Sequence, residues 1–150
     1  MRNILFSIAA VLSLQISAQS FNAIVNTEIP DDGTDISFDI EVTGLPDVID
    51  TLFGLETVCL NLDHTWDSDL EVKLIAPDGT TFLLFSGIGG DGDNFNFTCL
   101  NKYADNNITS GVAPYSGEYI PMGDMGLVNN GQNPNGTLSL IHISEPTRPY

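Results

Sequence analysis

The fold is decided by the segment Leu60–Leu70, which reads LNLDHTWDSDL, and by the sequence APDGT at Ala76–Thr80. Apolar residues recur at every second position on both sides of the polar stretch HTWDSD. This period of two is typical of β-strands with one face in a core. The Pro-Asp-Gly sequence then favours a tight turn, because proline fixes φ and glycine tolerates positive φ. We therefore expect a β-hairpin and one shared core. The predicted core residues are Phe38, Val58, Leu60, Leu62, Leu70, Val72 and Leu74.

Short alternating segments of this kind recur along the chain, separated by turn residues. No segment has a convincing apolar period of 3.6 residues, so little helix is expected. Many short strands with turns between them indicate an all-β protein built as a β-sandwich. Residues 86–94 are rich in Gly and Asp and are expected to form a loop. The expected strands cover residues 36–42, 57–63, 70–76, 81–85, 95–100 and 115–121, with a short lead-in strand over 21–25.

The ordered set of motifs resembles the P domain, also called the Homo B domain, of the proprotein convertases and their bacterial relatives. Besides the two stretches above, IPDDG at 29–33, GVAPYSGEYIP at 111–121 and GQNPNGT at 131–137 stand in the order of the family's landmarks. The resemblance implies a jelly-roll β-sandwich over residues 29–137. In the convertases this domain packs against a subtilisin-like serine endopeptidase domain, stabilises it and tunes its calcium and pH dependence.

The N-terminal residues 1–18 are predicted to be a secretory signal peptide. A cationic start is followed by a short apolar run and by a small residue, Ala18, after which we place the cleavage, with Ser20 as the alternative position. The competing interpretation is a membrane anchor. No later segment has about 18 unbroken apolar residues, so a secreted, extracellular protein without membrane contact is expected after cleavage. Residues 19–28 would then be a lead-in segment to the domain.

The C-terminal residues 138–150 are interpreted as an artefact. The sequence LSLIHISEPTR at Leu138–Arg148 resembles the in-frame translation of a transposase-type sequencing-library adapter. The alternative is an ordinary last strand, since Leu138–Ile143 is β-compatible. After Asn-Gly-Thr the P-domain family normally has a Trp-containing strand and one further strand. We therefore expect that the domain lacks its last natural strand or strands, and that the natural protein continues beyond Thr137.

Composition narrows the possible partners. The formal net charge of −16 repels nucleic acid and anionic lipid, so neither is expected as a partner. The only cysteines, Cys59 and Cys99, are predicted to form a disulfide because an oxidising compartment permits it. A buried pair of free thiols is the alternative. Neither cysteine has the spacing of a zinc ligand.

No catalytic residues are predicted. His64 is the only histidine before the suspect tail, no Gly-x-Ser-x-Gly sequence occurs, and the stretch around Ser110 only faintly echoes that of a subtilisin nucleophile. The resemblance implies that His64 belongs to a structural strand end. We assign structural roles in strand ends and turns to His64, Asp69, Pro77 and Gly79.

One loop is a candidate calcium site. The sequence GGDGDNFN at 89–96 offers hard oxygen ligands on a flexible backbone, which calcium prefers. It is not an EF-hand loop, and a solvated acidic loop is the alternative. Asp67 and Asp69 are further possible ligands. The predicted ligands are Asp91, Asp93, Asn94 and Asn96.

These observations predict a secreted, non-catalytic P domain that stabilises or targets a partner domain. In the convertases the catalytic domain precedes the P domain, whereas here the signal peptide runs almost directly into it. Any catalytic or adhesive partner domain is therefore expected in the missing C-terminal part. The alternative function is an adhesive, ligand-binding or glycan-binding module of a larger exported protein. A complete small enzyme is a weaker third possibility.

Overall fold

The computed structural model describes residues 18–27, 29–30 and 33–144 of the chain, so the predicted signal peptide and residues 145–150 fall largely or wholly outside the described part. Within that part the chain is all-β, as predicted, and its helical segments are single 3₁₀ turns. None of these segments is long or apolar enough to cross a bilayer. The strands are β1 (Ile36–Val42), β2 (Thr57–Leu62), β3 (Leu70–Ile75), β4 (Thr81–Ser86), β5 (Phe95–Asn101), β6 (Gly117–Tyr119) and β7 (Gly136–Ser144). The 3₁₀ turns are η1 (Asp67–Asp69), η2 (Ile108–Ser110) and η3 (Met125–Leu127).

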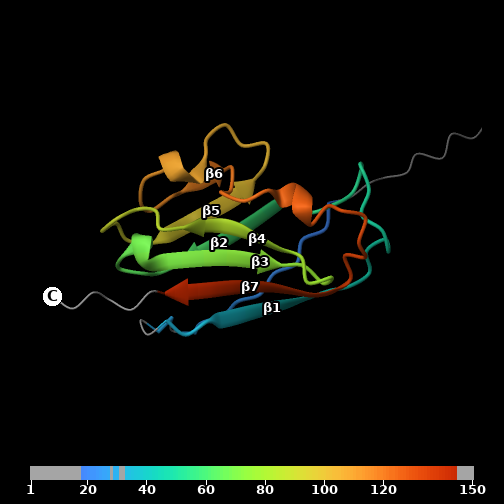
Figure 1. Ribbon diagram of the computed structural model, residues 1–150, viewed down its shortest axis with the longest axis horizontal. Helices are drawn as coiled ribbons and strands as arrows, with labels where there is room; N and C mark the ends of the chain where they lie inside the picture. The colour runs from blue at the N-terminus through green and yellow to red at the C-terminus, as the bar shows by residue number, and fades with distance from the viewer. Residues whose placement is uncertain (1–17, 28, 31–32, 145–150) are drawn as a thin grey trace, which may run out of the picture.

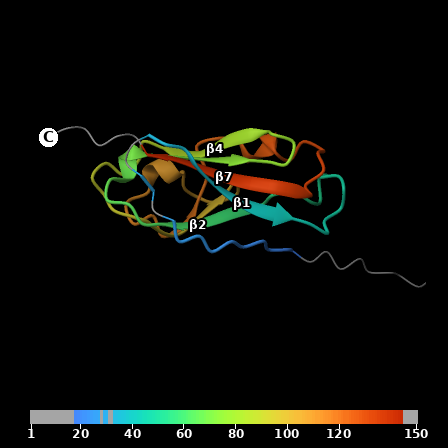
Figure 2. The same cartoon turned by 90° about the horizontal axis from the view of Figure 1, so that it is seen from below.

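The strands form two sheets that pack face to face. One sheet has the order β1-β7-β3-β4 and the other the order β2-β5-β6. Seen from below, the sheet that carries β4 and β7 lies above β2 (Figure 2). All neighbours are antiparallel except β5 and β6, which are parallel. Whether the strands wind as a jelly roll stays a prediction, whereas the β-sandwich class is confirmed.

Strand β7 lies inside its sheet and is flanked by β1 and β3 (Figure 1). Its residue His142 pairs in register with Ile36 of β1 on one side and with Val72 of β3 on the other. The β-compatible segment 138–143 therefore does form a strand. This strand joins β1 to the rest of the sheet.

The predicted hairpin joins β3 to β4. Ala76 N–H donates to Thr80 O over 2.8 Å and Gly79 N–H donates to Ala76 O over 2.9 Å, which closes the turn. Gly79 has a φ of +86°, a conformation that favours glycine. The Asp78 carboxylate accepts a hydrogen bond from Thr80 N–H at 2.8 Å. The turn chemistry read from Pro-Asp-Gly is thus confirmed.

The core lies between the two sheets and contains most of the predicted residues. Leu60, Leu62, Leu70, Val72 and Leu74 are buried, and Val58 is half-buried against them. Phe38 is the exception: it is only half-buried and lies outside the main buried cluster. The reason is its position on β1, an edge strand whose sheet neighbour, β7, lies on one side only. The further members of the core are Ala76, Phe82, Leu84, Phe85, Phe95, Leu100, Ile108, Tyr115, Met125 and Val128.

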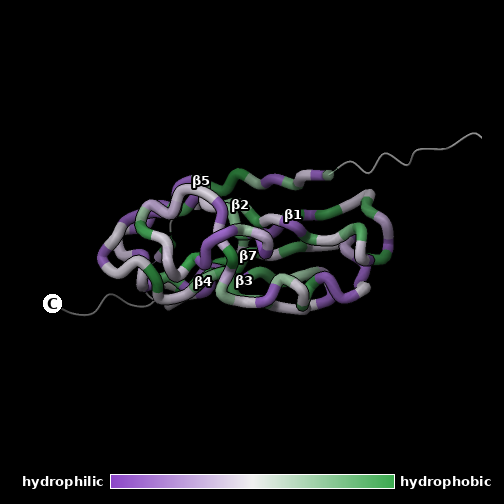
Figure 3. The backbone as a smooth tube through the Cα atoms, turned by 90° about the horizontal axis from the view of Figure 1, so that it is seen from above, coloured by the Kyte–Doolittle hydropathy of each residue, from purple (hydrophilic) through white to green (hydrophobic). Residues whose placement is uncertain are grey.

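The predicted lead-in strand over residues 21–25 is wrong. This segment is extended but pairs with no strand in the described part of the chain, and it runs along the outside of the sandwich (Figure 3). Ile24 is 92% exposed. An apolar alternation makes a strand only where a sheet edge offers hydrogen-bond partners. The strand expected over 115–121 is also shorter than predicted, since only Gly117–Tyr119 pairs with β5.

The disulfide between Cys59 and Cys99 is confirmed. The two residues are register partners on β2 and β5, with Cα atoms 4.0 Å apart. The bond ties the middle of this sheet together.

Two asparagine side chains, Asn129 and Asn135, hydrogen-bond to the irregular backbone between β1 and β2. Asn135 accepts a hydrogen bond from Leu45 N–H and donates one to Leu45 O, both over 2.9 Å. Asn129 makes the same pair of bonds with Leu55, over 2.8 and 2.9 Å. Each side-chain amide therefore pairs with both the N–H and the C=O of one residue, as a neighbouring strand would do in a sheet.

Candidate functional site

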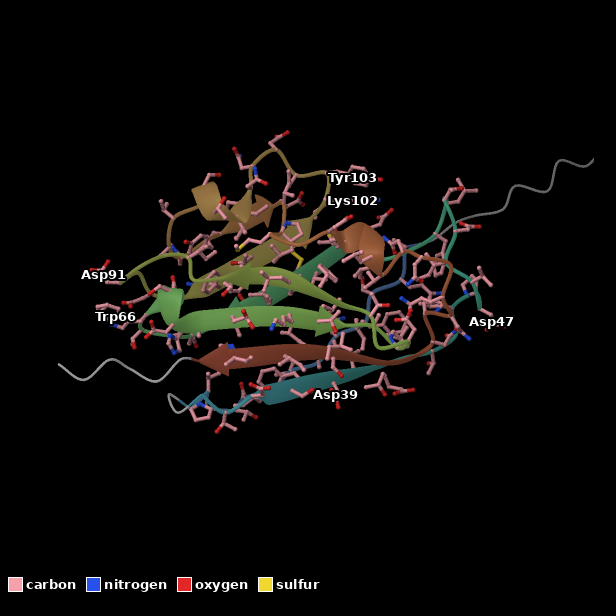
Figure 4. All side chains as sticks on the ribbon, in the orientation of Figure 1. Asp39, Asp47, Trp66, Asp91, Lys102 and Tyr103 are labelled. Carbon is pink, nitrogen blue, oxygen red and sulfur yellow. A yellow bond between two sulfur atoms is a disulfide. The ribbon has the colours of Figure 1, made fainter. Side chains whose placement is uncertain are left out.

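The candidate site is the end of the sandwich where η1 meets the glycine-rich loop 87–94. Trp66 and Asp91 lie at this end, opposite Asp47 (Figure 4). Asp67 N–H donates to Gly92 O over 3.0 Å, and Ser68 N–H donates to Gly90 O over 3.2 Å. These bonds fix the loop on η1 although the two segments are separated in sequence by β3 and β4.

Asn94 closes the loop against the end of β2. Its backbone N–H donates to His64 O over 3.0 Å, and its side-chain oxygen accepts from His64 N–H over 2.9 Å. Asn94 has a φ of +72°, which asparagine tolerates better than most residues. The His64 side chain turns toward its own strand end, with Nδ1 3.0 Å from Trp66 O. Both residues thus shape the loop.

Asp67 is the unexpected feature of the site. Its side chain is 0% exposed, and neither carboxylate oxygen has a hydrogen-bond partner. Its pKa is raised from 3.8 to about 6, chiefly by burial, and the negative charge of Asp93 acts in the same direction. The Asn94 backbone N–H and the charge of His64 act in the opposite direction. A buried carboxylate without partners is costly, so the site favours a compensating positive charge.

Two glycines let the loop close tightly over Asp67. A Cβ built on Gly89 would lie 2.6 Å from the Asp67 Cβ and 3.2 Å from its Oδ2. A Cβ on Gly92 would lie 2.7 Å from the Ala113 Cβ and 3.6 Å from the same Oδ2. A side chain at either position would therefore displace the loop or the carboxylate.

An aromatic stack supports the site from the core. The Phe85, Phe95 and Tyr115 rings stack with centroid distances of 4.4 Å and 4.7 Å. The Tyr115 hydroxyl oxygen lies 3.1 Å from the Cβ position of Gly89, next to Asp67. Burial raises the pKa of Tyr115, and the Asp67 charge raises it further. The phenol therefore remains a neutral hydroxyl beside the carboxylate at ordinary pH.

The predicted calcium ligands are only partly brought together. Asp91 and Asp93 are exposed in the loop, whereas Asn96 lies on β5 and its backbone N–H donates to Pro114 O over 2.8 Å. In the described part of the chain no three His, Cys, Asp or Glu side chains converge as a metal site. Calcium binding by Asp91, Asp93, Asn94 and Asn96 stays a prediction. The further possible ligand Asp69 lies in η1, where its backbone N–H donates to Trp66 O.

His142 is a second buried polar group, on β7. It is 0% exposed, and both ring nitrogens lack hydrogen-bond partners. Its ring centroid lies 6.5 Å from that of His64. Its pKa is lowered from 6.5 to about 4, chiefly by burial, and the charge of His64 acts in the same direction. Among the described residues none forms a hydrogen bond with the imidazole.

His142→Leu is expected to stabilise the fold by about 1–2 kcal/mol at pH 7.5, because it removes two unpaired polar atoms from the core. Since the pKa of His142 is about 4 in the folded state and 6.5 in the unfolded state, acidification through this window favours unfolding. Between pH 7.5 and 4.5 the wild type should lose about 2–3 kcal/mol from this group, and the variant should not. Urea unfolding at pH 7.5 and 4.5 measures both effects. Thr137→Val, at an exposed position of β7, is the control. Equal pH dependence in wild type and His142→Leu would contradict the interpretation.

Comparison with known proteins gives a family match over part of the chain. Residues 56–109 match the model of the proprotein convertase P-domain family. The predicted resemblance is confirmed over this segment, which spans β2 to β5, η1 and both cysteines.

A named relative extends the similarity. The chain is 31% identical over 113 residues to leupeptin-inactivating enzyme 1 of Streptomyces exfoliatus. The match covers 75% of this chain and 25% of the relative, so the chain spans about a quarter of that protein's length. No solved structure matches the chain.

Proposed function

We propose that the chain is an exported, non-catalytic P domain that serves as an accessory module and stabilises or targets a peptidase domain. The observation that carries the proposal is the P-domain match over residues 56–109. The relative is named as an enzyme, and three quarters of its length lie outside the match, which leaves room for a separate catalytic domain.

The side chains whose sequence context resembles hydrolase motifs have structural positions, which supports a non-catalytic role. Ser110 Oγ donates to Asn107 O over 2.7 Å at the turn η2. His64 Nδ1 lies against the backbone of Trp66. Asp67 is buried beneath the loop and is separated from solvent.

The test begins with the natural gene. Independent reads of the locus give the sequence that follows Thr137, and the full protein is then compared with a form that lacks residues 29–137. We expect the deletion to shorten the half-life of peptidase activity at elevated temperature several-fold, because the accessory domain slows unfolding of its partner. The isolated chain should hydrolyse no peptide and should not react with a serine-directed phosphonate. An unchanged half-life, or labelling of Ser110, would contradict the proposal.

A surface hollow favours a second candidate function, that of a ligand-binding or glycan-binding module. The hollow has a volume of about 400 Å³ and is lined by residues 50–56, Lys102, Tyr103, Gly126 and Asn129. Tyr103 is 75% exposed, and Lys102 Nζ lies 4.8 Å from its ring centroid (Figure 4). An exposed ring with polar neighbours suits a sugar face. Glycan binding that is lost in Tyr103→Ala, together with no effect on any peptidase, would favour this function over the first.

A further inference from the structure

We propose that Asp67, with Asp93 beside it, binds an oxygen-preferring divalent cation of the calcium class at the junction of η1 and the loop 87–94. The proposal goes beyond the accessory role, because it concerns the domain by itself and holds whether or not a peptidase is its partner.

The first support is the state of the Asp67 side chain. Among the described residues its two buried oxygens accept no hydrogen bond, because the Asn94 N–H that acts on this carboxylate donates to His64 O instead. Native proteins rarely leave a buried carboxylate in this condition, since its desolvation is compensated by nothing. A cation supplies the missing partner for both oxygens.

The second support is the way the loop is held. Three backbone hydrogen bonds, from Asp67, Ser68 and Asn94, fix it to η1 and to the end of β2. The close approach of Gly89 and Gly92 to Asp67 leaves no space for side chains there. The glycines thus bring the loop backbone against one carboxylate, and carboxylate and backbone carbonyl oxygens are the mixed ligand set that calcium accepts.

Charge gives the third support. Asp93 directly follows Gly92, whose carbonyl accepts from Asp67 N–H, and its charge acts on the Asp67 carboxylate. The chain as a whole carries a formal charge of −16. Two carboxylates that repel each other at one site are relieved together by a divalent ion. Oxygen donors on an irregular backbone favour calcium over magnesium, which requires near-ideal octahedral geometry.

The proposal revises the ligand set predicted from the sequence. Asp93 is retained, and Asp67 becomes the central ligand. The side-chain oxygen of Asn94 already accepts from His64 N–H, and Asn96 lies on β5. Asp91 is exposed at the tip of the loop.

The experiment compares thermal unfolding of the full, oxidised chain at pH 7.5 in millimolar calcium chloride, in magnesium chloride and in chelator. Binding to the folded state alone raises the melting temperature in proportion to ln(1 + [Ca²⁺]/Kd). We expect calcium to raise it by about 5–10 °C in the wild type, and magnesium to have a much smaller effect. Isothermal titration with calcium should show one site.

Asp67→Asn separates this proposal from a general effect of calcium on an acidic protein. The variant should melt higher than the wild type in chelator, because it removes a buried unpaired charge, and should show no calcium response. Asp93→Asn should respond weakly. Asp47→Asn removes an exposed charge at the opposite end of the molecule and should respond as the wild type does (Figure 4). Equal melting temperatures of the wild type in calcium and chelator, or an undiminished response in Asp67→Asn, would overturn the proposal.

Discussion

A chain that ends at Thr137 is expected to lose its cooperative unfolding transition. The deletion removes most of β7, which is the only sheet neighbour of β1 in the described part of the chain and also a neighbour of β3. Leu138 and Leu140, which pack on the core, leave with it. Far-ultraviolet circular dichroism, thermal unfolding and dye binding should report exposed apolar surface and an aggregation-prone open sheet.

The control for this deletion is a chain that ends at Ser144, which retains the whole of β7. It should unfold at the same temperature as the full chain. A cooperative transition in the chain that ends at Thr137, at an unchanged midpoint, would show that β7 contributes no stability.

The stability of β7 and its origin are separate questions. A strand that inserts between two others needs apolar side chains and free backbone hydrogen-bonding groups, and a translated adapter would supply both by chance. The unpaired, buried His142 is the kind of misfit expected of a strand that was never selected for this position. The assignment of residues 138–150 to an adapter stays a prediction, which genomic reads downstream of Thr137 decide.

Loss of the disulfide is the second change for which a large effect is expected. Cys59 and Cys99 are 40 positions apart in sequence, so opening the bond should lower the free energy of unfolding by about 4 kcal/mol on the chain-entropy account. Urea unfolding of the oxidised chain, of the chain reduced with dithiothreitol and of the Cys59→Ser/Cys99→Ser variant measures this loss.

The double variant also serves as the control, because the reductant should not change its midpoint. Cys59 is exposed, so the reductant reaches the bond in the folded protein. If the oxidised and reduced chains unfold at the same urea concentration, the bond does not stabilise the fold.

The strands could be predicted because each carries its own pattern. Alternation placed β1 to β5, and Pro-Asp-Gly placed the hairpin between β3 and β4. The same reasoning failed for residues 21–25, since pairing depends on which sheet edge the segment meets, and alternation does not contain that information. Phe38 likewise has a core pattern, but its burial depends on how far the other sheet extends over the edge strand β1.

The candidate site was predictable only in outline. Carboxylate density drew attention to Asp91 and Asp93, whereas the buried carboxylate is Asp67 on another segment. Its burial follows from loop 87–94 folding back onto η1, a long-range contact that no local pattern encodes. The sequence offered Asp67 only as a further possible ligand, and the close approach of Gly89 and Gly92 to it is visible only in the structure.

The amide pairing of Asn135 with Leu45 has a chemical consequence for stored protein. Asn135 is followed by Gly136, and an asparagine before glycine is the most easily deamidated, because the next backbone nitrogen reaches the side-chain carbonyl without steric hindrance. Ammonia leaves, and hydrolysis of the cyclic imide yields an acid. That acid can still accept from Leu45 N–H but cannot donate to Leu45 O, so one bond becomes a repulsion between two oxygens. Ageing in alkaline buffer therefore loosens this end of the sandwich first.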